Sequence, residues 1–124
     1  MRVLLVDDEV ELVSTLAERL SMRGIDTDWA CDVEHAQDLV SHNRYDLAVL
    51  DVKIPRMNGL TLKKRLEELQ PSMHFIFMTG HGSEEDFHEA AAEAGSQYYL
   101  VKPVKIEVLL EKMKEILNSG EQGL

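Results

Sequence analysis

The stretch that decides the fold is LAVLDVKIPRMNG, residues 47–59. Its four apolar residues, 47–50, predict a strand buried on both faces, as the strands of a parallel sheet are. The strand ends at Asp51, and a carboxylate beside a buried strand is costly unless it is paired. Pro55 and Gly59 then indicate a shaped loop before the next helix.

The composition is that of one globular domain, with 124 residues of which 44% are hydrophobic and 29% charged. The formal net charge of -10 argues against nucleic-acid binding through the bulk surface. Cys31 is the only cysteine, so no internal disulfide can form. The apolar run at the N-terminus is too short for a signal peptide or a membrane span, so we expect a cytoplasmic location without membrane contact.

Short apolar runs alternate with longer segments of helical period. The runs cover residues 3–6, 26–30, 47–50, 75–78 and 98–101, and the half-polar second run reads as an edge strand. Helices are expected at about 9–23, 33–42, 60–69, 83–94 and 106–117. Five β-α units in strict alternation predict a doubly wound α/β fold with five parallel strands and five helices.

The ends of two segments carry further signals. Asp8 and Glu11 form a capping-box pattern at the first helix, and Gly24 follows that helix. Residues 119–124 are polar and contain glycine, which is typical of a frayed terminus or of the start of a linker. We therefore expect the folded domain to cover residues 1–118.

Polar side chains follow four of the five predicted strands: Asp7 and Asp8, Asp51, Thr79, and Lys102. The carboxyl ends of parallel strands form the ligand crevice of such a fold, so we expect these side chains to meet there. Asp8 by itself is explained equally well as a helix cap. Asp51 is not, because the next helix begins some eight residues later.

Three carboxylates in one crevice need protons or a cation. Two of them about 4 Å apart repel by roughly 4 kcal/mol at an effective dielectric constant near 20. Oxygen ligands without His or Cys favour a hard ion such as Mg²⁺. Mg²⁺, a lysine and a threonine hydroxyl could neutralise three phosphoryl oxygens, with the central carboxylate as phosphoryl acceptor.

Four motifs together resemble the receiver domain of bacterial two-component response regulators: Asp7-Asp8, Asp51 with Pro55 and Gly59, Thr79-Gly80, and Lys102-Pro103. Each motif is weak alone, but the four occur in this order on alternating strands, and the resemblance covers about residues 2–118. It implies a flavodoxin-like sheet with strand order 2-1-3-4-5.

The resemblance implies a role for each site residue. Asp51 would be the phosphoacceptor, and Asp8 and Asp51 would bind Mg²⁺ by their side chains, with Asp7 acting through water. The backbone carbonyl of Lys53 would complete the protein ligands of the metal. Lys102 would contact the phosphoryl group.

A further set of residues would report or tune phosphorylation. Thr79 would close on the phosphoryl group by a hydrogen bond, and Tyr99 would be the switch aromatic that turns inward when the threonine moves. The Lys102–Pro103 peptide bond is expected to be cis. Lys53 and His81 stand at positions that tune phosphoryl lifetime in the family, although His81 reads more simply as a polar loop residue.

The resemblance implies a phosphoacceptor signalling domain that catalyses its own phosphorylation and hydrolysis and turns over no separate metabolite. A sensor histidine kinase or a phosphotransfer protein would be the donor. Phosphorylation would switch the face formed by the helix at 83–94, the last strand and the last helix, which would control an output domain or pair in a homodimer. Only Phe87 is large and apolar in the helix at 83–94, so burial should hold that helix weakly.

Three other functions remain for comparison. A flavin-binding protein would need a hydroxyl- or glycine-rich phosphate loop where Asp7-Asp8-Glu9 stands. An aspartate-nucleophile phosphatase would need a carboxylate at the position of Lys53. A receiver that binds partners without phosphorylation is disfavoured by the complete set of site residues. The stretch TGHGS, residues 79–83, resembles receivers attached to transcriptional activators.

Overall fold

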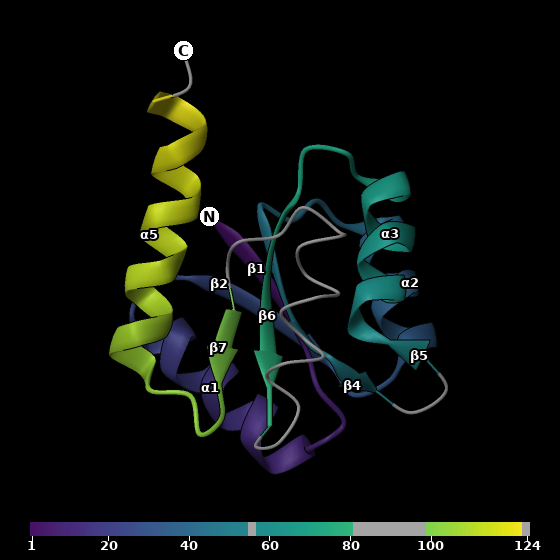
Figure 1. Cartoon of the computed structure of the whole chain (residues 1–124), viewed down its shortest axis with the longest axis horizontal. Helices are drawn as coiled ribbons and strands as arrows, with labels where there is room; N and C mark the ends of the chain where they lie inside the picture. The colour runs from purple at the N-terminus through teal and green to yellow at the C-terminus, as the bar shows by residue number, and fades with distance from the viewer. Residues whose placement is uncertain (55–56, 81–98, 123–124) are drawn as a thin grey trace.

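A five-stranded parallel sheet lies between two layers of helices in the computed structural model, which describes residues 1–54, 57–80 and 99–122 (Figure 1). The strands follow the predicted spatial order, β2-β1-β3-β6-β7, with the half-polar β2 at one edge as expected. Their bounds are β1 Arg2–Val6, β2 Asp26–Ala30, β3 Leu47–Asp51, β6 His74–Thr79 and β7 Tyr99–Val101. The predicted start of the last strand, Tyr98, lies outside the described residues.

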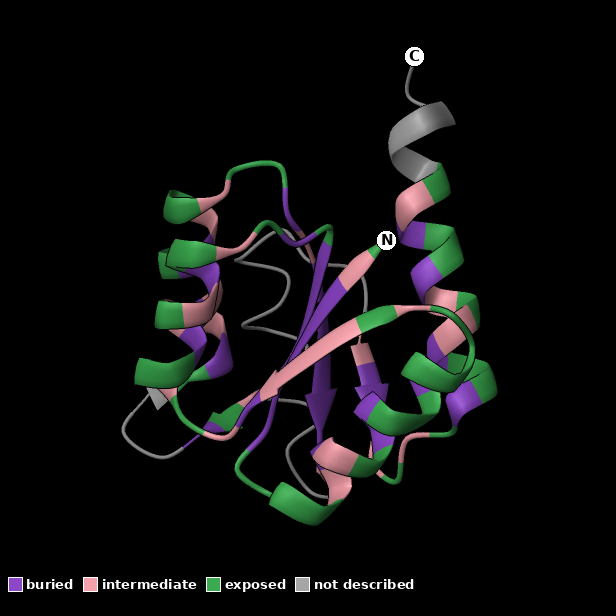
Figure 2. Cartoon of the chain, turned by 180° about the vertical axis from the view of Figure 1, so that it is seen from behind, coloured by how far each residue is buried: buried purple, intermediate pink, exposed green. Residues whose placement is uncertain are grey.

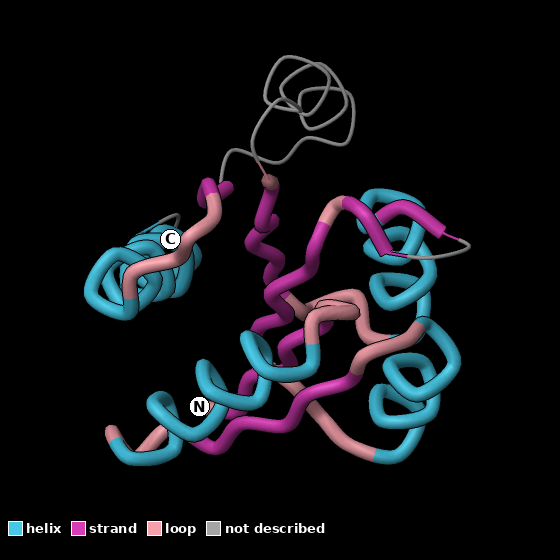
Figure 3. The backbone as a smooth tube through the Cα atoms, turned by 90° about the horizontal axis from the view of Figure 1, so that it is seen from below, coloured by secondary structure: helices cyan, strands magenta, loops and turns pink. Residues whose placement is uncertain are grey.

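Among the described residues, two helices cover each face of the sheet (Figure 3). They are α1 Val10–Met22 and α5 Ile106–Gln122 on one face, and α2 Val33–His42 and α3 Gly59–Leu69 on the other. The fifth expected helix, at 83–94, lies outside the described residues. Helix α5 continues to Gln122, so the polar residues from 118 to 122 are helical. Within the described ranges, no helix is both long and apolar enough to cross a membrane.

Alternate strand residues feed two separate cores, because successive side chains of a strand point to opposite faces. Leu50 packs in the core under α2 and α3, whereas Val49 packs in the core under α1 and α5. The central strand β3 is buried at all five positions (Figure 2). By the same alternation, Asp7 and Asp51 continue the α1/α5 face of β1 and β3.

The start of α1 corrects one prediction. The N-cap residue is Glu9, and it makes no side-chain cap hydrogen bond, so the capping box of Asp8 and Glu11 is wrong. Asp7, and not Asp8, binds the backbone before the helix, since its Oδ1 accepts a hydrogen bond of 2.9 Å from the backbone N–H of Glu9. The end of α1 is as expected, because Gly24 has a φ of 81°, which a residue with a Cβ rarely adopts.

A short antiparallel hairpin between β3 and α3 was not predicted. It pairs β4 (Lys53–Ile54) with β5 (Met57–Asn58), and Pro55 falls outside the described residues. Asn58 then caps α3, because its Oδ1 accepts a hydrogen bond of 2.8 Å from the backbone N–H of Thr61. The hairpin returns the chain so closely that the backbone N–H of Gly59 bonds the carbonyl of Val52 at 2.8 Å.

Candidate functional site

The carboxyl ends of four strands bring the predicted site residues together. Val6 and Leu50 are register partners in β1 and β3, and the aspartates Asp7 and Asp51 follow them directly. Asp51 is itself paired with Met78 of β6, one residue before Thr79. The order of the parallel strands therefore places the acids of β1 and β3 next to each other.

Three carboxylates form a cluster at this edge. Asp7, Asp8 and Asp51 each offer one oxygen, and these oxygens all lie within 4.8 Å of one another. Asp7 and Asp51 are buried, whereas Asp8 is exposed. Such a set of hard oxygen donors, open on one side to solvent, can hold a metal ion.

Lys102 lies at the centre of the acidic side chains. Its Nζ is 2.8 Å from Oδ2 of Asp7, 2.8 Å from Oε1 of Glu9 and 3.1 Å from Oδ2 of Asp51. The contacts to Glu9 and Asp51 are hydrogen bonds. The contact to Asp7 is an ion pair without hydrogen-bond geometry, so Oδ2 of Asp7 is a buried oxygen that accepts no hydrogen bond from the described part of the chain. That oxygen is suited to a metal ion or a metal-bound water.

The ionisation of the site follows from burial and from these contacts. Burial raises the pKa of Asp7 to about 6, against the opposing effects of the Lys102 ammonium and the backbone N–H of Glu9. Burial alone would lower the pKa of Lys102, but its contacts with Asp7, Glu9 and Asp51 outweigh burial, and the pKa is raised. Lys102 is thus a permanent cation in the cluster.

The backbone of Lys53 also contacts the Asp51 side chain. The backbone N–H of Lys53 donates a hydrogen bond of 3.2 Å to Oδ1 of Asp51, while the Lys53 side chain is exposed. The two carboxylate oxygens of Asp51 therefore have different neighbours, since Oδ1 faces the backbone of β4 and Oδ2 faces Lys102.

Thr79 and Tyr99 lie on neighbouring strands. Thr79 is buried, and its carbonyl accepts a hydrogen bond of 2.8 Å from the backbone N–H of Lys102. Tyr99 is half-buried against the α2/α3 core and pairs in register with Phe77, two residues before Thr79. Thr79 and Tyr99 therefore share one face of the sheet. The Lys102–Pro103 peptide bond is cis, as expected, and His81 lies outside the described residues.

Glu9 is the site residue that sequence reasoning missed. Its carboxylate is as close to Lys102 as that of Asp7, yet in the sequence it is only the last acid of a run of three. Its position two residues after Asp7, before a helix, was the available signal. The pattern could not show that the helix start leaves this side chain free for a residue 93 positions away.

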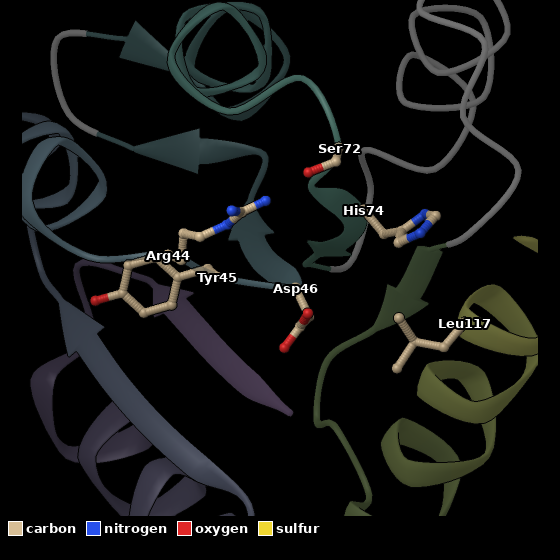
Figure 4. A pocket seen from close by; sticks show the side chains of 6 residues that line it. All are labelled: Arg44, Tyr45, Asp46, Ser72, His74 and Leu117. Carbon is tan, nitrogen blue, oxygen red and sulfur yellow. The ribbon is translucent and has the colours of Figure 1, made fainter.

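A pocket lies at the end of the sheet opposite to the carboxylate cluster (Figure 4). It encloses about 300 Å³, and its lining comes from the residues before β3, the start of β6 and α5: Arg44, Tyr45, Asp46, Ser72, His74 and Leu117. Because Asp46 and Asp51 stand at opposite ends of β3, the pocket is about 16 Å from the carboxylate cluster. It shares none of the predicted site residues.

Comparisons with known proteins agree on one family. Residues 3–114 match the family model of the response regulator receiver domain. The chain is 34% identical to the response regulator MprA of Mycobacterium sp. strain KMS over 125 residues, which covers 99% of this chain and 54% of that protein. It therefore spans about half the length of the MprA proteins that it matches.

Solved structures agree with the family match. A CheY-like receiver domain protein from Methanospirillum hungatei superposes with a TM-score of 0.87 at 31% identity, covering 99% of this chain and 98% of that one. NtrX from Brucella abortus superposes with a TM-score of 0.88 at 27% identity, covering 98% of this chain and 28% of NtrX. The fold recurs as a separate small chain and as part of a longer one.

Proposed function

Because this chain belongs to the family of response regulator receiver domains, we propose that it is phosphorylated on Asp51 in a reaction that requires Mg²⁺. One observation carries this proposal. The Asp51 carboxylate is buried at the end of β3, with Lys102 Nζ 3.1 Å from one oxygen and two further aspartates within 4.8 Å. Asp7 also has a backbone N–H and Lys102 as neighbours. Asp51 differs because it ends the central strand β3 and accepts a hydrogen bond from Lys102.

Asp51 acts as the nucleophile. An oxygen lone pair of its carboxylate forms the new P–O bond, while the bond from phosphorus to the donor breaks and the donor leaves with that electron pair. The new group is an acyl phosphate, and hydrolysis by water restores the carboxylate. The chain thus promotes its own phosphorylation and dephosphorylation and serves as a signalling domain.

The other acids would hold the metal. Asp8 and Asp51 would bind Mg²⁺ directly, Asp7 through water, and the backbone carbonyl of Lys53 would add a neutral ligand. The buried Oδ2 of Asp7, which accepts no hydrogen bond from the described residues, and the three hard oxygen donors fit this ion. Mg²⁺, when bound, supplies positive charge that offsets the charge on the transferred phosphoryl group. Lys102, which directly follows β7, supplies a further positive charge.

Thr79 and Tyr99 would report the phosphorylated state. Thr79 would donate its hydroxyl to the phosphoryl group, and Tyr99 would turn inward behind it. Their position on one face of the neighbouring strands β6 and β7 supports this coupling. The face of residues 83–94, β7 and α5 would then change its contacts with an output domain or with a second copy in a homodimer.

The donor would be the phosphohistidine of a sensor histidine kinase or of a phosphotransfer protein. The chain spans about half the length of the MprA proteins, so an output module of transcriptional type is the further expectation, and direct nucleic-acid contact by this domain is not. The net charge of -10 supports that division of roles.

The proposal is tested by intact-mass measurement after incubation with acetyl phosphate and Mg²⁺. A single phosphoryl adduct is expected that requires Mg²⁺ and disappears in Asp51→Asn. Asp38→Asn, an exposed carboxylate on α2, is the matched control and should label as the wild type does. No adduct on the wild type, under conditions that label another receiver, would instead favour a phosphorylation-independent binding module.

A further inference from the structure

The Glu9 carboxylate is a group of the site that the proposed reaction does not use. Its Oε1 accepts a hydrogen bond of 2.8 Å from Lys102 Nζ, across 93 positions of sequence. Glu9 is the N-cap residue of α1, yet its side chain makes no cap hydrogen bond. The carboxylate is thus committed to Lys102 and not to its own helix.

The three carboxylate partners of Lys102 are unequal. The side chains of Asp7 and Asp51 are 0% and 6% exposed, whereas the Glu9 side chain is 59% exposed. Exposed ion pairs contribute little, and separating a buried pair leaves an uncompensated charge in the interior. Glu9 is therefore the partner that Lys102 can release at the lowest cost.

The number of donors on Lys102 makes this difference matter. An ammonium group has three donor hydrogens, and three carboxylates lie within 3.1 Å of this Nζ. Glu9 and Asp51 each accept a hydrogen bond from this group, and the Asp7 oxygen lies 2.8 Å from the same Nζ. A phosphoryl oxygen on Asp51 therefore competes with these carboxylates for a position beside Nζ. A metal ion bound by Asp8 and Asp51, with Asp7 holding it through water, would compensate the charges of these aspartates but leave Glu9 on the lysine.

We propose that Glu9 occupies the position on Lys102 that a phosphoryl oxygen takes, so that phosphorylation of Asp51 displaces Glu9 from Lys102. This inference rests on the proposed function and goes beyond it, since it assigns a role to a residue outside the phosphoacceptor, metal and switch sets. Glu9 is a positioning residue, because it acts on the lysine and does not touch the phosphoryl group.

Removing the Glu9 charge should therefore speed phosphorylation. In Glu9→Gln the lysine keeps only a neutral acceptor at this place, which is easier to displace than a carboxylate. At saturating Mg²⁺ we expect the phosphorylation rate constant to rise about two- to fivefold, the factor that corresponds to one exposed ion pair. Glu11→Gln is the matched control, because Glu11 is an exposed acid in the first turn of the same helix.

The experiment has two readouts. The first is the time course of the phosphoryl adduct by intact mass, with acetyl phosphate and Mg²⁺, for the wild type, Glu9→Gln and Glu11→Gln. The second is the side-chain carboxyl resonance of Glu9 in protein labelled with ¹³C-glutamate, assigned by its loss in Glu9→Gln. Beryllofluoride with Mg²⁺ then serves as a stable phosphoryl analogue on the wild type.

The outcomes separate the inference from the function it rests on. Faster labelling of Glu9→Gln alone, with a shifted Glu9 carboxyl resonance on beryllofluoride binding, supports the displacement. A wild type that labels normally, with Glu9→Gln equal or slower, overturns the inference and leaves the function standing. An unshifted Glu9 resonance in beryllofluoride-bound protein overturns it as well. A wild type that never labels overturns both.

Discussion

Gly59 lies against the main chain of Asp51 so closely that a Cβ at position 59 would collide with the Asp51 carbonyl oxygen. The three nearest atoms all belong to the backbone of Asp51 and Val52, so no flexible side chain could move aside for the added Cβ. The first residue of α3 thus fixes the end of β3, where the phosphoacceptor stands.

Gly59→Ala should therefore displace the backbone that carries Asp51. The backbone of β3 or of α3 must shift, and we expect a loss of about 1–3 kcal/mol in the free energy of unfolding. We also expect labelling of Asp51 by acetyl phosphate to slow at least tenfold, because small displacements of a reacting group are costly. Chemical denaturation and intact mass measure the two effects. Thr61→Ala, an exposed change in the same helical turn, is the control, and equal behaviour of the two variants would contradict the prediction.

Lys102 should stabilise the metal-free fold by compensating buried carboxylates. Lys102→Met leaves Asp7 and Asp51 without their cation, which we expect to cost about 3 kcal/mol of unfolding free energy in the absence of divalent ions. Mg²⁺ should restore much of this loss, so the rise in Tm on adding Mg²⁺ should be larger for the variant than for the wild type. Thermal unfolding with EDTA and with Mg²⁺ tests both. A variant that gains no more from Mg²⁺ than the wild type would show that lysine and metal do not share these acids.

Asp7 gives the metal-free protein a defined pH dependence. Its pKa in the folded protein is about 6, above the ordinary aspartate pKa of 3.8, so the folded state binds the proton more tightly than the unfolded state does. The stability that this proton contributes is complete below about pH 4 and is lost as pH rises through 6. The shift corresponds to roughly 3 kcal/mol across that window.

Asp7→Asn removes this titration. In EDTA, the stability of the variant relative to the wild type should therefore increase between pH 4.5 and pH 7.5, since only the wild type must bury the charge. Paired denaturant melts in the same buffers measure the difference, and groups that titrate alike in both proteins cancel. A difference that is flat or falls with pH would mean that burial does not raise the Asp7 pKa in the folded protein.

The strand ends explain how much of this site could be predicted. Runs such as residues 47–50 are apolar because both faces of β3 are covered. A polar residue directly after such a run marks the end of the strand. That signal is local, and the structure places Asp7, Asp51 and Lys102 in contact at this one edge of the sheet. The strand order was also predicted, although from the family resemblance and not from the pattern.

Features that depend on distant contacts or on small backbone differences could not be predicted. The Asp8 cap was wrong because Glu9 is the N-cap residue, one position later, and because Asp7 is the aspartate that accepts a hydrogen bond from the backbone N–H of Glu9. The β4–β5 hairpin is only two residues per strand, too short for an alternating pattern. The Glu9–Lys102 contact joins chain segments whose spacing carries no information about each other.

Tyr45 ties the edge strand to the centre of the sheet. Its hydroxyl donates a hydrogen bond of 2.6 Å to Oδ2 of Asp28 on β2, and the same oxygen accepts from Arg2 of β1 at 2.9 Å. Tyr45 is 4% exposed, and the Arg2 guanidinium lies 5.2 Å from the centre of its ring. Burial and the Asp28 carboxylate both raise the pKa of Tyr45, so the hydroxyl keeps its proton and remains a hydrogen-bond donor at physiological pH.

Tyr45→Phe should cost about 1.5–3 kcal/mol of unfolding free energy, the range for a hydrogen bond to a charged group. The ring and its contact with Arg2 remain, so a double-mutant cycle with Asp28→Asn isolates the hydroxyl–carboxylate bond. We expect a coupling energy near 1 kcal/mol or more from denaturant unfolding of the four proteins. Labelling of Asp51 should be unchanged in Tyr45→Phe, because Tyr45 precedes β3 and Asp51 ends it. Additive losses in the cycle would mean that the Tyr45 hydroxyl and the Asp28 carboxylate are not energetically coupled, which would contradict the prediction.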